Sequence, residues 1–447
     1  MGTKGSVQFA AQGGVTEARV LAAEVCGDLR NGEMLDSSFE RRAVALDSRD
    51  RRWMQELVYG MLRRRARLDA ILSSRVRGGL ARLDPDLVDL LRLGVDQLLY
   101  MRSVPAYAAI AQTVELAKRR HGIGASKLAN AVLRRVDRER EDLSVSVDGD
   151  EVDQLALEYS HPRWIVARWL ERFGRSETVQ LLEANNTEPP LIARPYGIVR
   201  EQLEATLEAA GVKVADAPLV PDSLELQGAA ALTELGAYKQ GLFFIQDPAS
   251  TLVSRYAAIT AGVTVADLCA APGGKSLEMA RVAGSVVASD RSHGRLQRVI
   301  ANVKRLDARD LLAFVGDARH PAIRPVDVVL IDVPCTGTGT FRRHPDARWR
   351  LRPSDLAVMT NLQRAICRGA ARVVAPGGLL IYSTCSLEPE ENEEQVATFL
   401  KEHPDFVLEP PPDGEIPNEV SSDGFLRVLP QRHGTDGAFA ARLRRVR

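Results

Sequence analysis

The chain of 447 residues is too long for one ordinary domain, and its hydrophobic content of 45% is enough to form several packed cores. Its formal net charge is zero, but residues 1–145 hold 25 Lys and Arg against 19 Asp and Glu, so a basic excess lies at the front. Five widely spaced cysteines without a C-x-x-C pair argue against a disulfide framework or a metal site, and no apolar run approaches 18 residues, so we expect a soluble, cytoplasmic protein with no membrane partner.

The front of the chain has the pattern of a helical bundle. From about residue 16 to residue 140, apolar residues recur at spacings of three and four, with breaks at Gly78 and Gly79 and a helix start at Pro85. The basic excess of this region is compatible with an RNA-binding surface and also with an ordinary solvated face. Residues 1–6 fit the loose pattern for N-myristoylation, but no second membrane signal accompanies them.

The middle of the chain changes to short elements separated by turn residues. Pro162 is placed to begin a helix, and residues 191–194 have a strand pattern, so we expect a small α+β domain over residues 146–240. His161, beside that proline, suits a turn better than a functional role.

From residue 241 onward, strands and helices alternate, which predicts a parallel sheet covered by helices on both faces. Two strand patterns near the end, at 423–430 and 437–442, have only a loop between them and predict an antiparallel edge hairpin. The earlier strands are expected near residues 263–268, 285–290, 311–315, 326–331 and 378–383.

The turn after the first of these strands has the composition of a ligand site. Residues 265–275 read V-A-D-L-C-A-A-P-G-G-K, in which Gly273 and Gly274 allow a sharp turn and a close approach to a ligand. A third glycine, which a dinucleotide would need, is missing, so a ligand without phosphates such as S-adenosylmethionine fits better. Asp290, which ends the next strand, is placed to hold ribose hydroxyls. An ordinary strand-turn-helix corner is the alternative.

Two later strands end in loops that carry cysteines. Residues 327–339 read D-V-V-L-I-D-V-P-C-T-G-T-G, with Asp332 and Cys335, and residues 379–386 read L-L-I-Y-S-T-C-S, with Cys385. Open α/β sheets bind ligands at the carboxyl ends of their strands, so these side chains are candidates for catalysis. Asp317 follows another strand end, where an aspartate is also a common helix cap. Each cysteine could instead be a small buried hydrophobe.

Together, the A-A-P-G-G-K, D-x-P-C and T-C-S segments resemble those of the RNA 5-methylcytosine methyltransferases. Further similarity, at residues 159–162, 185–186 and 241–250, points to the bacterial Sun/Fmu (RsmB-type) enzymes of 16S ribosomal RNA. Residues 57–63 and 129–134 are similar to the NusB fold that precedes the catalytic part in that family. Val333 and Thr336 stand where family members often carry other small residues.

The resemblance implies a NusB-like RNA-binding domain (residues 1–145), an RNA-presenting α+β linker (146–240) and a seven-stranded Rossmann-like methyltransferase domain (241–447). It implies that Cys385 is the nucleophile, that Cys335 assists breakdown of the adduct, and that Asp332 holds the base. The cofactor-binding residues it implies are Cys269, Ala270, Ala271, Pro272, Gly273, Gly274, Lys275, Asp290, Asp317 and Asp332.

Chemistry supports a role for a cysteine, because carbon 5 of cytosine becomes nucleophilic only after a thiolate adds to carbon 6. Lys275 could neutralise charge near the cofactor or lie in solvent. Residues 341–350 carry four arginines, His344 and Trp349, a composition that suits single-stranded RNA and also a solvated loop.

Three alternatives remain for the whole chain. A transfer RNA substrate would use the same catalytic residues, and a non-catalytic RNA-binding or antitermination protein would not need both cysteines. An NAD-dependent dehydrogenase would need the missing glycine. We expect a monomer, and the sequence does not identify the target cytosine.

Overall fold

The computed structural model describes residues 14–143, 145, 148–228 and 232–446, which form two compact units. The first unit contains the chain up to Asn186 together with residues 344–350, and the second contains residues 187–343 and 351–447. The myristoylation pattern of residues 1–6 lies outside the described residues. None of the helices described here is long and apolar enough to cross a membrane.

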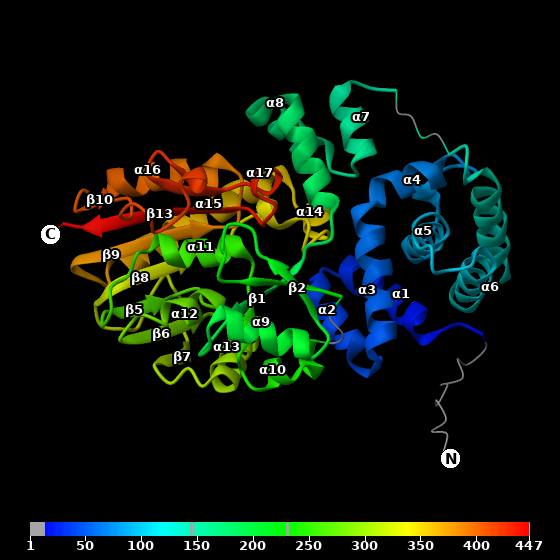
Figure 1. The fold of residues 1–447 in the computed structure, drawn as a ribbon. Coiled ribbons are helices and arrows are strands. Elements are labelled where there is room, and N and C mark those ends of the chain that lie inside the picture. Colours follow the sequence, from blue (N-terminus) through cyan, green and yellow to red (C-terminus); the bar gives the residue numbers. More distant parts are fainter. Residues whose placement is uncertain (1–13, 144, 146–147, 229–231, 447) are drawn as a thin grey trace, which may run out of the picture. The chain divides into compact units, whose positions relative to one another are not determined.

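The first unit is helical, which confirms the prediction from apolar spacing (Figure 1). Its helix α5 begins at Pro85, where the carboxylate of Asp84 accepts a hydrogen bond from the amide of Asp86. Positive φ angles at Gly122 and Gly174 interrupt α6 and α8. The helices are α1 (Glu17–Arg30), α2 (Leu35–Arg42), α3 (Ser48–Arg63), α4 (Arg65–Ser73), α5 (Pro85–Tyr100), α6 (Ala106–Glu139), α7 (Glu151–Glu158), α8 (Arg163–Asn186) and α14 (Ala347–Arg350).

The second unit begins with a four-stranded antiparallel sheet in the order β2-β3-β1-β4. The predicted strand at 191–194 is β1, and the sheet makes this region α+β as expected. Its last strand, β4, lies beyond the domain boundary that we placed at residue 240. The elements are β1 (Leu191–Pro195), α9 (Arg200–Ala209), β2 (Lys213–Asp216), β3 (Leu224–Gln227), α10 (Gly236–Lys239) and β4 (Phe243–Ile245).

A larger mixed sheet follows, in the order β11-β12-β13-β9-β8-β5-β6-β7, with β10 paired to β13. The strands β7, β6, β5, β8 and β9 are parallel, and β13 and β12 run antiparallel at one side, which confirms the seven-stranded arrangement. Two short strands, β10 and β11, extend it to nine. The strands are β5 (Thr264–Asp267), β6 (Ser285–Asp290), β7 (Leu311–Val315), β8 (Val326–Asp332), β9 (Val374–Thr384), β10 (Phe406–Leu408), β11 (Ser421–Ser422), β12 (Phe425–Val428) and β13 (Ala438–Arg445).

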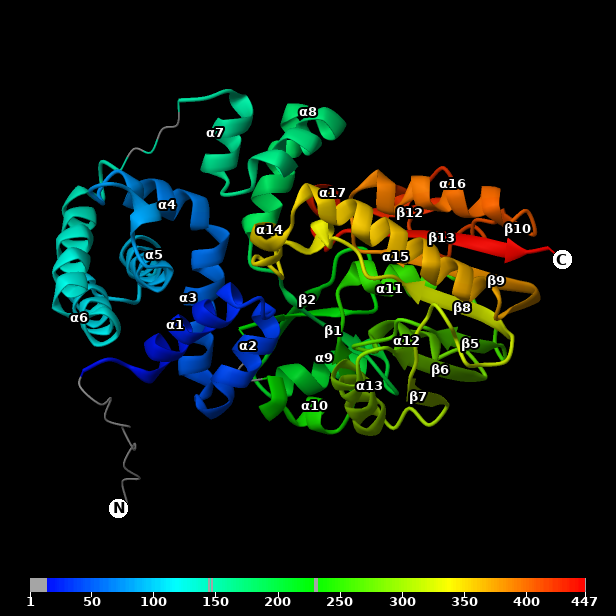
Figure 2. The ribbon, with the colours of Figure 1, turned by 180° about the vertical axis from the view of Figure 1, so that it is seen from behind.

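Both faces of the large sheet are covered by helices, as the alternating pattern predicts. In β8, Val328 and Leu330 belong to the core shared with α11, α12 and α13, whereas Val329 and Ile331 belong to the core shared with α15 and α16. Figure 2 shows α15 and α16 along the same side of the sheet. These helices are α11 (Pro248–Tyr256), α12 (Gly274–Met279), α13 (His293–Leu306), α15 (Pro353–Ala371) and α16 (Glu393–Glu402), and α17 (Pro430–His433) lies before β13.

Candidate active site

The turn after β5 brings the backbone close to the end of β6. Gly273 has a φ of +106°, which glycine adopts without strain, and a Cβ atom at Gly274 would lie only 2.8 Å from Nε2 of Gln246. The amide of Ala271 donates to Oδ2 of Asp290 at 3.3 Å, and the guanidinium of Arg295 donates to the carbonyl oxygen of Ala271. The loop is thus fixed against the end of β6 and against α13.

Asp290 is buried at the carboxyl end of β6, and its Oδ1 atom also accepts a hydrogen bond from the amide of Ser292 at 2.8 Å. Asp317 lies after β7, where Nε of Arg319 donates to its Oδ1 at 3.0 Å. Hydrogen bonds from Arg319 hold the pKa of Asp317 at about 2, so this carboxylate is ionised. A ligand that used Asp317 would therefore share it with Arg319.

Asp267, the last residue of β5, was not among the predicted site residues, and it forms hydrogen bonds to the turn and to α12. Its Oδ2 accepts a hydrogen bond from Ser276 at 2.6 Å, and its Oδ1 accepts one from the amide of Cys269 at 3.3 Å. Burial, and then the charge of Asp332, raises the pKa of Asp267 to about 7. Its position at a strand end, directly before the turn, is the sequence feature that could have identified Asp267 as a site residue.

The two predicted cysteines lie side by side. Strands β8 and β9 are parallel neighbours with Asp332 paired to Ser383, so the loops that follow them meet. The Sγ atoms of Cys335 and Cys385 are 3.3 Å apart. Hydrogen bonding to Cys385 and burial raise the pKa of the Cys335 thiol well above its ordinary value, so Cys335 remains protonated beside its neighbour.

Lys275 is not in solvent, and it lies against Asp332, with 2.7 Å between Nζ and Oδ2. The hydroxyl of Ser383 donates to the other carboxylate oxygen of Asp332 at 2.8 Å. Burial lowers the pKa of Lys275, but the negative charges of Asp332 and of a Cys385 thiolate outweigh it and raise the pKa above its usual value. The site therefore holds an ammonium group that is fixed by Asp332 and lies close enough to Cys385 to interact with a thiolate there.

A buried glutamate supports the loop of Cys335. The carboxylate of Glu391 accepts hydrogen bonds from the amide of Thr336 and from Nε2 of Gln363, both at 2.9 Å, and another from the hydroxyl of Thr336. Its negative charge contributes to the raised pKa of Cys335 after the effects of Cys385 and burial. Glu391 was not among the predicted site residues, and no sequence pattern links it to Thr336, 55 residues away.

Two of the four arginines of the loop at 341–350, Arg342 and Arg348, are buried, whereas Arg350 is exposed. Arg342 is buried and pairs with Asp247 and Asp436, at 2.8 Å and 2.6 Å. Arg348 is also buried and donates to the backbone carbonyl of Asn185 at 2.8 Å. The indole nitrogen of Trp349 donates to a backbone carbonyl in α3 at 2.7 Å. Arg342 and Arg348 are therefore not available as surface contacts, and the hypothesis that this loop binds single-stranded RNA stays a prediction for its other residues.

The carboxyl ends of β5, β6, β8 and β9 thus bring together the turn at 269–275, Asp290, Asp332, Cys335 and Cys385, and Asp317 lies beyond the neighbouring β7. Across residues 14–143, 145, 148–228 and 232–446, no group of three or more His, Cys, Asp and Glu side chains is arranged to hold a metal ion.

Comparisons with known families cover most of the chain. Residues 258–444 match the family described as 16S rRNA methyltransferase RsmB/F, and residues 16–138 match the NusB family. Residues 161–233 match the ferredoxin-like domain of RsmF/B-like methyltransferases.

Individual proteins give the same result. A probable ribosomal RNA small subunit methyltransferase B of Synechocystis is 35% identical, covering 96% of this chain and 99% of the relative. The ribosomal RNA small subunit methyltransferase B of Vibrio cholerae is 34% identical, and the match covers 90% of this chain and 94% of the relative. Among solved structures, the protein PH0851 has a TM-score of 0.80 and 28% identity, covering 96% of this chain and 99% of that one.

Proposed function

Because the chain belongs to the RsmB/F family of 16S ribosomal RNA methyltransferases, we propose that it transfers a methyl group from S-adenosylmethionine to carbon 5 of a cytosine in 16S ribosomal RNA, through a covalent cysteine adduct. The observation that carries the proposal is the distance of 3.3 Å between Cys335 and Cys385 at the ends of adjacent parallel strands. Two thiols at one reaction centre provide one group to form an adduct and another to help break it.

The chain offers a site that suits the cofactor. Nε2 of Gln246 is buried without a hydrogen-bond partner among the described residues, and it lies beside Gly274, where the lack of a side chain leaves the amide unobstructed. A polar ligand group there, such as the carboxylate of S-adenosylmethionine, would satisfy this donor. Asp290 would hold the ribose hydroxyls and Asp317 the adenine amino group. The cofactor supplies an electrophilic methyl group.

The residues of the chain supply the remaining chemistry. The thiolate of Cys385 forms a bond to carbon 6 of the base, which makes carbon 5 nucleophilic toward the methyl group. Asp332, oriented by Lys275 and Ser383, would hydrogen-bond the base edge and favour its protonated ring. After methyl transfer, carbon 5 loses its proton to a base, the bond from sulfur to carbon 6 breaks, and Cys385 leaves as a thiolate. Cys335 is placed to assist this last step.

A transfer RNA substrate would use the same residues, so the choice of ribosomal RNA rests on the relatives, whose names specify the small ribosomal subunit, and on the NusB-like front. A non-catalytic antitermination protein would gain nothing from the paired cysteines. Mapping of 5-methylcytosine in 16S ribosomal RNA from a deletion strain tests the substrate: one methylated cytosine should be lost, and unchanged ribosomal RNA would refute this part of the proposal.

The two cysteines test the mechanism because they should fail differently. In Cys385→Ala no adduct can form, so methylation should fall to background. In Cys335→Ala the nucleophile remains but elimination should stall, which would leave a protein–RNA complex that survives denaturing electrophoresis. The double variant should trap nothing. If Cys385→Ala traps RNA, the two roles are reversed, and if neither variant traps RNA and both stay active, the covalent mechanism is wrong.

A further inference from the structure

The first unit contains a cavity away from the catalytic residues. It has a volume of about 440 Å³, within the ~300–1,000 Å³ of typical small-molecule sites. Helices α1, α3, α4 and α5 contribute to its walls, and residues 346, 349 and 350 close it. All of these residues belong to the same compact unit. Neither Cys335 nor Cys385 lines this cavity, so its occupant would not be the reacting base.

The walls of the cavity carry more positive than negative groups. Four guanidinium groups line it, those of Arg30, Arg65, Arg92 and Arg350, against the carboxylates of Asp89 and Asp346. The remaining lining is mostly apolar. A cavity with this lining suits a ligand that has both an anionic group and an apolar, flat body.

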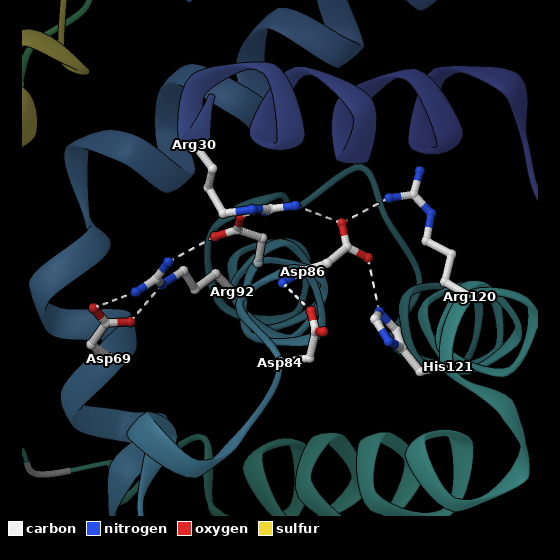
Figure 3. Close-up of polar contacts among 8 residues, drawn as sticks. Arg30, Asp69, Asp84, Asp86, Arg92, Arg120 and His121 are labelled. Carbon is white, nitrogen blue, oxygen red and sulfur yellow. Dashed lines mark hydrogen bonds and ion pairs between the residues drawn. The ribbon is translucent and has the colours of Figure 1, made fainter. Parts of the chain in front are cut away.

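Three of the four arginines already have carboxylate partners. Figure 3 shows that Arg30 reaches Asp86, which is shared with Arg120 and His121, and that Arg92 reaches both oxygens of Asp69. Asp89 lies between Arg30 and Arg92 and pairs with both. Arg350 pairs with Asp346 at 3.0 Å.

Arg65 differs from the other three arginines. Among the described residues it has no carboxylate within ion-pair distance, and its guanidinium lies over the ring of Trp349 at 5.4 Å from the centroid. Burial, and then the nearby charge of Arg92, lowers the pKa of Arg65 below its ordinary value. An anionic group of a ligand, bound beside Arg65, would relieve this unfavourable charge.

We propose that this cavity binds a nucleoside 5′-phosphate unit, with the phosphate on Arg65 and the base against the apolar wall that includes Met61, Leu62 and Leu83. A guanidinium matches the geometry of a phosphate through paired N–H donors, and planar groups stack on guanidinium and aromatic faces. The unit can be a free nucleotide or one nucleotide within an RNA strand. The site adds to the proposed methyl transfer and does not depend on it.

Fluorescence of the full-length protein provides a test without an activity assay. The four tryptophans are Trp53, Trp164, Trp169 and Trp349, so the signal of Trp349 is obtained as the difference from Trp349→Phe. Titration with uridine 5′-monophosphate should change this signal with saturation. Arg65→Gln should raise the dissociation constant at least tenfold, and Arg65→Lys should recover part of the affinity. The control Arg77→Gln removes an equal charge from an exposed residue outside the cavity and should bind as the wild type does.

The proposal is wrong if Arg65→Gln and Arg77→Gln, both folded by circular dichroism, bind the nucleotide equally, or if the wild type shows no saturable change. It is also wrong if inorganic phosphate binds as tightly as uridine 5′-monophosphate, because the base would then contribute nothing. Pentauridylate distinguishes the two sources of the ligand. Tighter binding than the mononucleotide, with the same dependence on Arg65, identifies a nucleotide within RNA, and binding no tighter than the mononucleotide identifies a free nucleotide.

Discussion

The carboxyl group of Asp267 should bind and release its proton near pH 7 in the folded protein. It is 1% exposed, and burial raises its pKa to about 7, against about 3.9 in an unfolded chain. The raised value contributes stability that is fully present below about pH 3.9 and is lost as the pH rises through 7. Between pH 5.5 and 7.5 the free energy of unfolding of the wild type should fall by about 2 kcal/mol relative to that of Asp267→Asn, because the asparagine does not titrate.

Hydrogen exchange of the strand amides in β5, β6 and β8 measures this difference, because its rate reports the free energy of opening. Tryptophan fluorescence would not, since all four tryptophans lie in the first unit. Comparing variant and wild type at each pH cancels the intrinsic pH dependence of exchange. The ratio of their rates should change by about 30-fold between pH 5.5 and 7.5.

Asp327→Asn is the matched control in the same sheet. Hydrogen bonds from Thr264 lower the pKa of Asp327, so this group stays ionised throughout the range and its variant should show a constant difference from the wild type. An equally constant difference for Asp267→Asn would show that Asp267 does not titrate between pH 5.5 and 7.5. The assigned burial penalty would then be refuted.

Substitutions at three further positions test the site. Asp290→Ala should weaken the binding of S-adenosylmethionine at least tenfold, measured by calorimetry, because it removes a charged acceptor worth roughly 1.5–3 kcal/mol per hydrogen bond. Unchanged affinity in a folded variant would show that Asp290 is not part of the site. Asp317→Ala should weaken the binding of S-adenosylmethionine less, because Arg319 already donates hydrogen bonds to that carboxylate. A larger loss of affinity than in Asp290→Ala would contradict this ranking. Glu391→Ala should destabilise the second unit by at least about 2 kcal/mol, measured by hydrogen exchange, because the backbone amide of Thr336 and the side-chain amide of Gln363 lose their acceptor. Glu391→Gln keeps an acceptor oxygen and should cost less. Equal losses of stability in the two variants would argue against this role.

Much of the fold could be predicted because burial leaves a periodic trace in the sequence. Strands β6 and β7 begin and end where the pattern placed them, and the two-sided burial of β8 follows from its continuous apolar run. Strands β10 and β11 escaped notice because each has three residues or fewer, too short for a pattern to stand out. The meeting of Cys335 and Cys385 could be anticipated because parallel strands present their carboxyl ends at one edge of a sheet.

The partners of charged side chains could not be predicted in the same way. Lys275 pairs with Asp332 across 57 residues, and Thr336 contacts Glu391 across 55, and no spacing rule links such positions. The sequence therefore predicted the candidate reacting groups, which the fold brings together, but not the contacts that hold them in place. The missed contacts matter for reactivity, because the buried carboxylate of Glu391 contributes to the raised pKa of the Cys335 thiol.

Arginine clusters show why local composition is a weak guide to a binding surface. The loop at 341–350 has the composition of an RNA-binding segment, yet the charges of Arg342 and Arg343 are matched by Asp247 and Asp436, which lie 93 to 96 residues away in the sequence. Arg65 lies in α4, outside that loop, and lines a cavity, where no carboxylate of the described residues is within ion-pair distance of it. Attraction for a phosphate depends on the charge that remains after nearby carboxylates are counted, and only the folded chain determines which carboxylates are near. On that criterion, the charges of Arg342 and Arg343 are matched by carboxylates, whereas Arg65 lines a cavity and forms no ion pair with a carboxylate of the described residues.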